Sequence, residues 1–284
     1  MSSVTGGERV NPYKRGLLEA FEGSTPYARL QTLGDMGALA VRSVKLAVRP
    51  PFPWWRDMIQ QVSLGIRRSI IPMVFAHGAY IVGFGIIMFA GILANLGIGD
   101  RVGGVMLIIW DREIATWITG MIFAGIVGAA VTADLGARKI REELDALAVL
   151  GVEQTRTLIV PRVVACTLGM PVLVIISLLI TQLFVVTITP TLYGYDTHIY
   201  VSALKSLIVP SDLYFTTLLK NIILGFFVGV VACYKGVSSK SGAEGVGRAV
   251  NQTVVITFFG IWLFNSLFNF AYFTLFSDAT ALRG

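Results

Sequence analysis

The sequence predicts an all-α integral membrane protein with an N-terminal interfacial amphipathic helix and five transmembrane helices. Three observations support this fold class. Of the 284 residues, 55% are hydrophobic and 14% are charged, against about 25% charged in an average soluble domain. The mean hydropathy is +0.72. The apolar residues also fall in runs long enough to cross a bilayer. These features exclude a disordered chain, a coiled coil and most soluble enzymes.

Five apolar runs are candidate membrane spans, since about 20 apolar residues are needed to cross the hydrocarbon core. They lie at residues 70–96, 114–133, 163–189, 213–234 and 250–276. A further apolar stretch at 102–110 is too short to cross by itself. The alternative is a set of buried helices in a soluble protein, but such helices are mostly about 8–20 residues long and keep a polar face.

Basic residues predict the orientation, because cytoplasmic loops carry an excess of lysine and arginine. Ten precede the first span, five lie between spans two and three, and three lie between spans four and five, against four on the opposite side. The N-terminus is therefore expected in the cytoplasm and the C-terminus outside. The net charge of +6 then reflects membrane orientation and not binding to nucleic acid.

The segment before the first span is polar or amphipathic and shows no signal peptide. Residues 1–27 are expected to form a poorly ordered cytoplasmic tail, and residues 277–284 a short external tail. Residues 28–69 form an amphipathic region in which an apolar stripe beginning at Leu30 precedes several prolines and tryptophans. A basic amphipathic helix of this kind lies in the membrane interface. The alternative is a soluble helix packed on a partner.

The polar segment at 134–160 has the pattern of a short cytoplasmic helix with one apolar face. That face comprises Ile140, Leu144, Leu147 and Ala148. The i,i+4 spacing predicts three ion pairs on the other faces. These pairs are Arg138 with Glu142, Lys139 with Glu143, and Arg141 with Asp145. An apolar ridge beside dense charge suits docking into a groove of a soluble partner, but an ordinary solvated helix fits the spacing equally well.

Small residues recur every four positions along the second span, which lets another helix or a second subunit approach closely. The row comprises Thr116, Gly120, Ala124, Gly128, Thr132 and Gly136. His77 lies in an uncharged stretch and is expected to be a hydrogen-bonded packing residue. Asn265 and Asn269 are expected to bond neighbouring helices. Two histidines and two cysteines, without a carboxylate cluster, predict no metal site.

Two segments carry a family resemblance. The run from Ala133 to Val152 reads ADLGARKIREELDALAVLGV and resembles the signature of the MlaE/YrbE permeases. The second segment reads CYKGV from Cys233, followed by GAEGVGRAVNQTV from Gly242, and is more similar to the YrbE branch. The resemblance covers roughly residues 50–276, and it identifies residues 70–276 as the permease domain.

The resemblance implies a non-catalytic permease subunit of an MCE-type ABC lipid transporter in the bacterial inner membrane. The family fold has an interfacial helix and five transmembrane helices, which agrees with the topology from charge. The helix at 134–160 would be the coupling helix that docks in an ATPase subunit. The implied partners are ABC ATPase subunits, a second and paralogous permease, MCE proteins on the outer side, and a lipid such as a fatty acid, sterol or phospholipid. The chain has no P-loop, so ATP would be used by the separate ATPase, and no cofactor is expected here.

Three charged residues lie near the expected lipid path. An ionisable residue inside a span is costly and is by default a functional candidate. Arg112, Glu113 and Lys220 look like the positions that line a lipid pocket in the MlaE branch, although the family's proline soon after this glutamate is replaced here by other residues. We expect Lys220→Ala to abolish lipid uptake with complex assembly intact. The alternative is a structural ion pair between Glu113 and Lys220.

Two other functional classes are alternatives to the permease. An integral membrane enzyme acting on lipids would use Asp111 and Glu113 as acid and base, but the sequence offers no nucleophile or metal to join them. A secondary transporter would usually show two similar halves, and five spans without a visible repeat disfavour it.

Overall fold

The computed structural model describes residues 25–194 and 196–276, which form helices joined by short turns, with no strand among them. Five helical runs are long and apolar enough to cross a membrane. They are Trp55–Asn95, Gly99–Ile140, Thr155–Tyr193, Asp212–Val237 and Ala243–Leu275. The predicted all-α, multi-pass membrane fold is thereby confirmed. The predicted tail at 277–284 and nearly all of the tail at 1–27 lie outside the described residues.

The runs are divided into consecutive segments. The label α marks α-helix, and the label η marks π-helix except for η2, which is a 3-10 helix. The first run comprises α3 (Trp55–Tyr80), η1 (Ile81–Ala90) and α4 (Gly91–Asn95). The second comprises η2 (Gly99–Arg101), α5 (Val102–Met106), η3 (Leu107–Ile114), α6 (Ala115–Phe123), η4 (Ala124–Gly128) and α7 (Ala129–Ile140). The remaining runs are η5 (Thr155–Ile159) with α9 (Val160–Tyr193), η6 (Asp212–Leu219) with α11 (Lys220–Val237), and α12 (Ala243–Leu275). Outside the runs lie α2 (Thr25–Ala47), α8 (Glu143–Val149) and α10 (Thr197–Leu207).

Helix ends coincide with residues that start or stop a helix. Pro161 lies in the first turn of α9, directly after η5 of the same helical run. Gly194 ends the same helix in the left-handed region with φ 68°. Asp196 caps α10 by accepting a bond from the backbone N–H of His198 at 2.9 Å.

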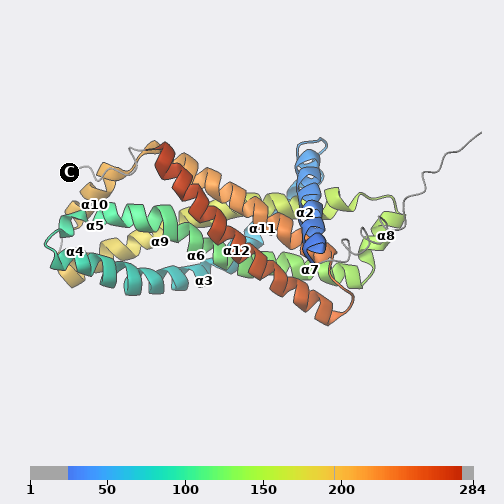
Figure 1. Ribbon diagram of the computed structural model, residues 1–284, viewed down its shortest axis with the longest axis horizontal. Helices are drawn as coiled ribbons and strands as arrows, with labels where there is room; N and C mark the ends of the chain where they lie inside the picture. Colours follow the sequence, from blue (N-terminus) through green and yellow to red (C-terminus); the bar gives the residue numbers. More distant parts are fainter. Residues whose placement is uncertain (1–24, 195, 277–284) are drawn as a thin grey trace, which may run out of the picture.

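The helices form an elongated bundle in which α12 crosses diagonally over α11 and α6 (Figure 1). α9 packs against both α3 and α11. α4, α5 and α10 gather at one end of the bundle, called the α10 end below, and α8 projects at the other, the α8 end. α2 runs across the bundle near the α8 end (Figure 1).

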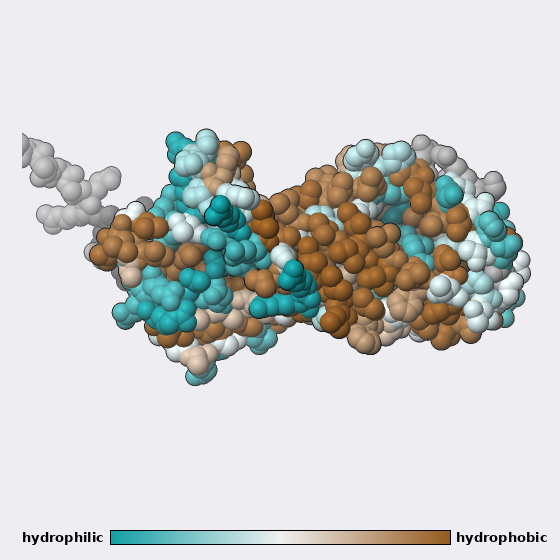
Figure 2. All heavy atoms as spheres, turned by 180° about the vertical axis from the view of Figure 1, so that it is seen from behind, coloured by the Kyte–Doolittle hydropathy of each residue, from teal (hydrophilic) through white to brown (hydrophobic). Residues whose placement is uncertain are grey.

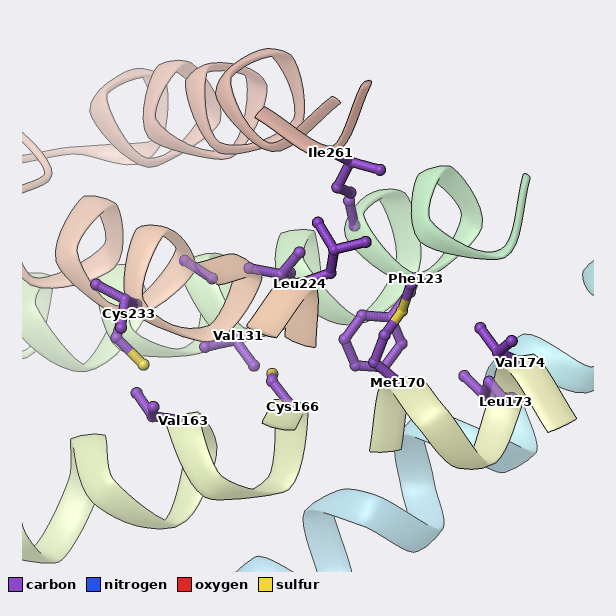
Figure 3. Close-up of a cluster of buried hydrophobic side chains, with 14 of the residues drawn as sticks. Phe123, Val131, Val163, Cys166, Met170, Leu173, Val174, Leu224, Cys233 and Ile261 are labelled. Atoms are coloured by element: carbon purple, nitrogen blue, oxygen red, sulfur yellow. The ribbon is translucent and has the colours of Figure 1, made fainter. Parts of the chain in front are cut away.

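The main core lies where the second, third, fourth and fifth runs meet (Figure 3). Phe123, Met170 and Leu224 are almost fully buried there. Cys166 and Cys233 belong to the same cluster, and both are free thiols. They act as small packing residues, as their apolar surroundings predict.

The small-residue row of the second run packs against α11 and α12 of the same chain. The Thr132 hydroxyl lies 3.0 Å from the carbonyl oxygen of Ala232 and 2.9 Å from the Thr253 hydroxyl. A Cβ added at Gly136 would lie 2.9 Å from the Val246 side chain. Close approach of backbones is the ordinary use of such a row in a membrane.

The surface supports the membrane assignment. In Figure 2 a hydrophobic waist separates two ends that carry most of the hydrophilic residues. Large apolar side chains of the spanning runs are exposed, with Phe75 and Phe270 both 75% exposed. A soluble protein rarely exposes a continuous apolar belt, so the belt is the part that faces lipid.

Two of the helical runs extend further than the apolar runs in the sequence. The first begins at Trp55 and not near residue 70, so residues 55–69 of the predicted interfacial region belong to the spanning helix. The second begins at Gly99, so the stretch at 102–110 is its first part. Hydropathy marks only the portion suited to the hydrocarbon core, whereas helical hydrogen bonds continue into the polar flanks. A run of 42 residues spans roughly 60 Å at 1.5 Å per residue, about twice the thickness of that core.

The three regions counted as cytoplasmic meet at the α8 end. Arg42 of α2 pairs with Glu153 at 2.9 Å. Lys139 donates to the carbonyl oxygen of Ser239 at 2.8 Å, which joins the second run to the loop before α12. The three regions that the charge count places on one side of the membrane therefore lie at one end of the bundle.

Candidate functional site

A buried ion pair forms the centre of a polar cluster toward the α10 end. Arg112, on η3, donates from Nε to Oδ1 of Asp212 at 2.7 Å and from Nη2 to Oδ2 at 2.9 Å. The Arg112 side chain is 1% exposed. Asp212 begins the fourth run and also accepts bonds from the Tyr272 hydroxyl at 2.9 Å and from the backbone N–H of Val209 at 3.1 Å. The pair therefore ties the second, fourth and fifth runs together.

Lys220 lies in the same cluster and is completely buried. Its Nζ donates to the carbonyl oxygen of Arg112 at 2.6 Å and to Oδ1 of Asn269 at 3.2 Å. The ammonium also lies 5.9 Å from the centre of the Phe268 ring, within the range of a cation–π contact. These bonds offset part of the cost of burying a cation among apolar helices.

Glu113 is only half-buried, unlike its two charged neighbours. It accepts a bond from Nδ2 of Asn265 at 2.8 Å. Glu113 and Lys220 make no direct salt bridge, although their opposite charges interact across the cluster. Asn265 and Asn269, one turn apart on α12, hold the two residues separately. Both asparagines bond neighbouring helices, as predicted.

A second polar chain lies beside this cluster. Gln182 of α9 donates to Oδ2 of Asp111 at 2.8 Å and accepts a bond from the Tyr200 hydroxyl at 2.5 Å. Burial raises the pKa of the Tyr200 hydroxyl, and the nearby Asp111 raises it further, so Tyr200 stays a donor. Asp111 is thereby fixed between two helices.

His77 is buried and hydrogen-bonded, as predicted. Its Nε2 lies 3.1 Å from the Thr119 hydroxyl, and its Nδ1 lies 3.4 Å from the Thr181 hydroxyl. Trp110 also donates to Thr181, at 3.2 Å. The histidine therefore links the first three runs.

The chemistry available to this cluster is recognition of charge. No group of three or more histidine, cysteine or acidic side chains suited to a metal occurs in the described part of the chain. Arg112 and Lys220 are sequestered by protein oxygens, and Glu113 is the charged side chain of the predicted set that reaches the surface. The arrangement offers a carboxylate, a nearby buried cation and apolar walls, which suit an amphiphile more than a polar solute.

The coupling-helix candidate is broken in two. α7 ends at Ile140, Glu142 adopts φ 59°, and α8 begins at Glu143. The three predicted i,i+4 pairs are therefore wrong. Arg138 pairs instead with Asp134 and Glu143, both at 3.3 Å, and Arg141 pairs with Glu143 at 2.6 Å. The hydrogen bond from Glu143 raises the pKa of Arg141, so the guanidinium remains charged.

The apolar face of this segment also differs from the prediction. Leu144 turns inward and is 6% exposed, whereas Val149 and Leu150 at the tip of α8 are 88% and 75% exposed. Asp145 and Glu142 are exposed, while Lys139 is held by Ser239. The surface free for a partner is thus the tip of α8 with its acidic flank.

An ion-pair junction fixes the base of this segment to the next span. Arg162 of α9 donates to Asp134 of α7 and, at 2.6 Å, to the carbonyl oxygen of Leu158. Gln154 donates to the carbonyl oxygen of Leu144 and holds α8 from the other side. α8 is therefore held to α7 through the Arg138–Glu143 pair and to the segment just before η5 through Gln154.

Comparison with known proteins identifies the family. The family described as Permease MlaE matches residues 58–271. The chain belongs to the MlaE permease family.

Relatives of this MlaE-family permease occur in plants and bacteria. Protein TRIGALACTOSYLDIACYLGLYCEROL 1, chloroplastic, of Arabidopsis thaliana is 29% identical over 74% of the chain and 59% of its own length. A probable ABC transporter permease protein of Synechocystis is 31% identical over 60% of the chain and 64% of its own length. One from Rickettsia bellii is 27% identical over 79% of the chain and 86% of its own length. The permease thus spans about three fifths of the first two relatives.

Several site residues of the permease were not anticipated from the sequence. Asp212 is one, and its position at the start of an apolar run, opposite an arginine in another run, was the available signal. Asp134 and Arg162 are others, and they pair with each other in the structure. Their partners are far away in the chain, so only the fold pairs them.

Proposed function

We propose that this chain is the permease subunit of an MCE-type ABC transporter in a bacterial inner membrane. It would pass a lipid, such as a fatty acid, a sterol or a phospholipid-like molecule, with energy from a separate ATPase. The N-terminus would lie in the cytoplasm and the C-terminus outside. Membership of the permease family and relatives named as ABC transporter permeases support this function. One relative is named for a galactolipid.

One observation carries the lipid assignment. Glu113 is half-exposed in a polar cluster surrounded by apolar helices, and Lys220 lies buried in the same cluster. A substrate with a polar head and an apolar body would place its head at Glu113 and its body along the apolar helices. Lys220 would contribute its positive charge from the buried part of the cluster. That charge would favour an anionic headgroup when the bonds from Lys220 to Arg112 and Asn269 open.

The energy of ATP hydrolysis would be transmitted to the permease through the α8 end. The exposed tip at Val149 and Leu150 would insert into a groove on the ATPase. The surrounding charges, including Arg141 and Asp145, would form the rim of that contact. Because α8 is bonded to α7 and to Gln154 just before η5, and α7 is tied to α9 by Asp134 and Arg162, closure of the ATPases would move both spans together.

Two further partners complete the proposal. A second permease, most simply a paralogue, would pair with this chain around a central cavity. MCE proteins would receive or deliver lipid at the α10 end. The resemblance to the YrbE branch supports both partners, and the apolar belt supports a membrane-embedded contact for the second permease.

The test begins with copurification from the native membrane. An ATPase and MCE proteins should copurify with the chain, and the reconstituted complex should move lipid only with ATP. Glu113→Gln should lower transport at least tenfold with assembly unchanged, because glutamine keeps the bond to Asn265 and loses the charge. Asp57→Asn, on the exposed start of α3, is the matched control and should transport normally. Transport driven by an ion gradient alone would contradict the proposal.

A further inference from the structure

A cavity of about 370 Å³ lies at the α8 end between α2, the end of α11 and the start of α12. Its walls come largely from the second signature segment. Tyr234 and Lys235 belong to the CYKGV run, and Arg248 and Gln252 belong to the glycine-rich run that follows it. The two halves of that motif therefore meet around one hollow, far from the polar cluster of Arg112 and Lys220.

Three cations line this cavity. Lys235 donates to Oε1 of Gln252 at 3.0 Å. Lys240 makes no ion pair or side-chain hydrogen bond with any other described residue. Arg248 is exposed and pairs with Glu244 at 3.5 Å, a long contact between side chains that are 60% and 84% exposed. Such a contact neutralises little of the charge of Arg248.

Carboxylates approach the cavity only from its rim. Glu244 reaches Arg248 from outside, and Asp35 of α2 accepts a bond from the Tyr234 hydroxyl at 3.4 Å. Neither carboxylate is among the residues that line the cavity. The interior is therefore electropositive.

Uncharged donors face the same space. The Ser239 side chain is 5% exposed and lines the cavity, yet its Oγ has no hydrogen-bond partner in the described chain. A buried hydroxyl without a protein partner is costly, so this hydroxyl is a donor available to a group bound at the cavity wall. The first turn of α12, a helix of 33 residues, presents unpaired backbone N–H groups and the positive end of the helix dipole beside it.

The backbone is shaped to bring these groups together. A Cβ added at Gly245 would lie 2.1 Å from the carbonyl oxygen of Lys240. Only glycine therefore lets the loop that carries Ser239 and Lys240 lie directly on the first turn of α12. Gly242 supports the same turn with φ 88°. The glycines of the second signature segment therefore determine the shape of the cavity.

We propose that this cavity binds a phosphate group, and that the phosphate belongs to the headgroup of an anionic phospholipid in the cytoplasmic leaflet. Cations, a hydroxyl, an amide and a helix N-terminus are the donors that recognise phosphate. α2, which forms one wall, exposes Leu30 and Leu33 and runs across the bundle as an interfacial helix. The cavity therefore lies at headgroup depth. A soluble phosphate compound is the other source of the same chemistry.

The test uses the chain purified with its copurifying subunits in dodecyl maltoside, a detergent without phosphate. Hydrogen–deuterium exchange is followed in the segment 234–252 with dihexanoyl phosphatidylglycerol, with glycerol 3-phosphate or with inorganic phosphate. Slower exchange with phosphatidylglycerol alone supports the lipid headgroup. Slower exchange with glycerol 3-phosphate or inorganic phosphate at the same concentration supports phosphate binding but replaces the lipid by a soluble compound. Unchanged exchange with all three compounds overturns the proposal. An acidic protein surface would then be the better candidate for the partner of the cavity.

Variants decide whether the cavity residues are responsible. Lys240→Gln with Arg248→Gln should weaken binding at least about tenfold, because charge-assisted hydrogen bonds are lost, and both positions are exposed enough to tolerate the change. Arg56→Gln with Arg67→Gln, both exposed on α3 outside the cavity, is the charge-matched control and should bind normally.

Ser239→Ala separates binding from folding. It should weaken phosphate binding without lowering the unfolding temperature of the ligand-free protein, since the hydroxyl bonds nothing there. A lower unfolding temperature with unchanged binding would mean that Ser239 is structural. Equal binding by the Lys240/Arg248 double variant and the parent would contradict the site itself.

Discussion

Arg112 and Asp212 are separated by 100 positions in the chain, yet two parallel hydrogen bonds of 2.7 and 2.9 Å join them inside the bundle. Bidentate pairs of this kind fix orientation as well as distance. The fourth run therefore begins at a defined place against the second. Lys220, eight positions later, is thereby aligned with the carbonyl oxygen of Arg112.

Asp212→Asn should destabilise the permease strongly, because Arg112 would keep its charge in a buried place without a counter-ion. The expected loss is about 3 kcal/mol in the free energy of unfolding, measured by thermal unfolding in detergent. Asp100→Asn is the control, since Asp100 pairs with Arg101 at 3.5 Å on the surface and should cost little. A double replacement of Arg112 and Asp212 by leucine should recover part of the loss, and failure to do so would contradict the electrostatic explanation.

Lys220→Ala should lower stability as well as transport, which revises the expectation from the sequence. The side chain is fully buried, and its removal leaves a cavity and an unbonded Asn269 oxygen. Lys220→Met fills most of that volume without the charge. We expect it to restore the unfolding temperature toward the parent and still to transport poorly. Normal lipid transfer by Lys220→Met would show that the cation has no part in substrate recognition.

Gly225→Ala should force α9 and α11 apart. A Cβ at Gly225 would lie 2.4 Å from the carbonyl oxygen of Cys166 and 2.8 Å from the Met170 Cβ. Overpacking of this kind costs about 1–3 kcal/mol, so the unfolding temperature should fall. Gly125→Ala has no atom within 4 Å of the new Cβ and should be neutral or slightly stabilising. Equal effects of the two substitutions would contradict the close helix contact.

Leu150→Asp should weaken assembly with the proposed ATPase while the permease still folds, because Leu150 is 75% exposed. Copurification of the ATPase should fall at least tenfold if this side chain enters a groove. Val48→Asp changes a side chain that is 71% exposed near the end of α2 and serves as the control. If both variants copurify the ATPase equally, the tip of α8 is not the docking surface.

Much of this fold is predictable because the bilayer imposes it. A span must satisfy its backbone within itself and expose apolar side chains, and both demands appear directly as hydropathy and length. The meeting of α2, α7 and the loop before α12 at one end follows from the positions of lysine and arginine. Hydropathy does not predict which residue pairs with each buried charge. Arg112 was recognised as a candidate, but its pairing with Asp212 depends on how the two helices are rotated.

The break between α7 and α8 at Glu142 could not be predicted from the sequence either. Periodicity at 138–145 fits a continuous helix, and no glycine or proline interrupts it. Side-chain bonds across the turn hold it, since Arg138 and Arg141 both reach Glu143 and Gln154 holds Leu144. Local propensity is a weak prior against several such contacts.

α12 connects two places that are otherwise remote. Its first turn forms a wall of the electropositive cavity, and its last turns hold Glu113 and Lys220 through Asn265 and Asn269. A helix of 33 residues is about 50 Å long at 1.5 Å per residue, and it crosses the bundle obliquely (Figure 1). A force on the first turn of α12 would tilt the helix about its contacts with α11 and α6. A tilt of α12 at the headgroup level would therefore displace both asparagines in the opposite direction, and the grip on the two charged side chains would change without any movement of the helices that carry them.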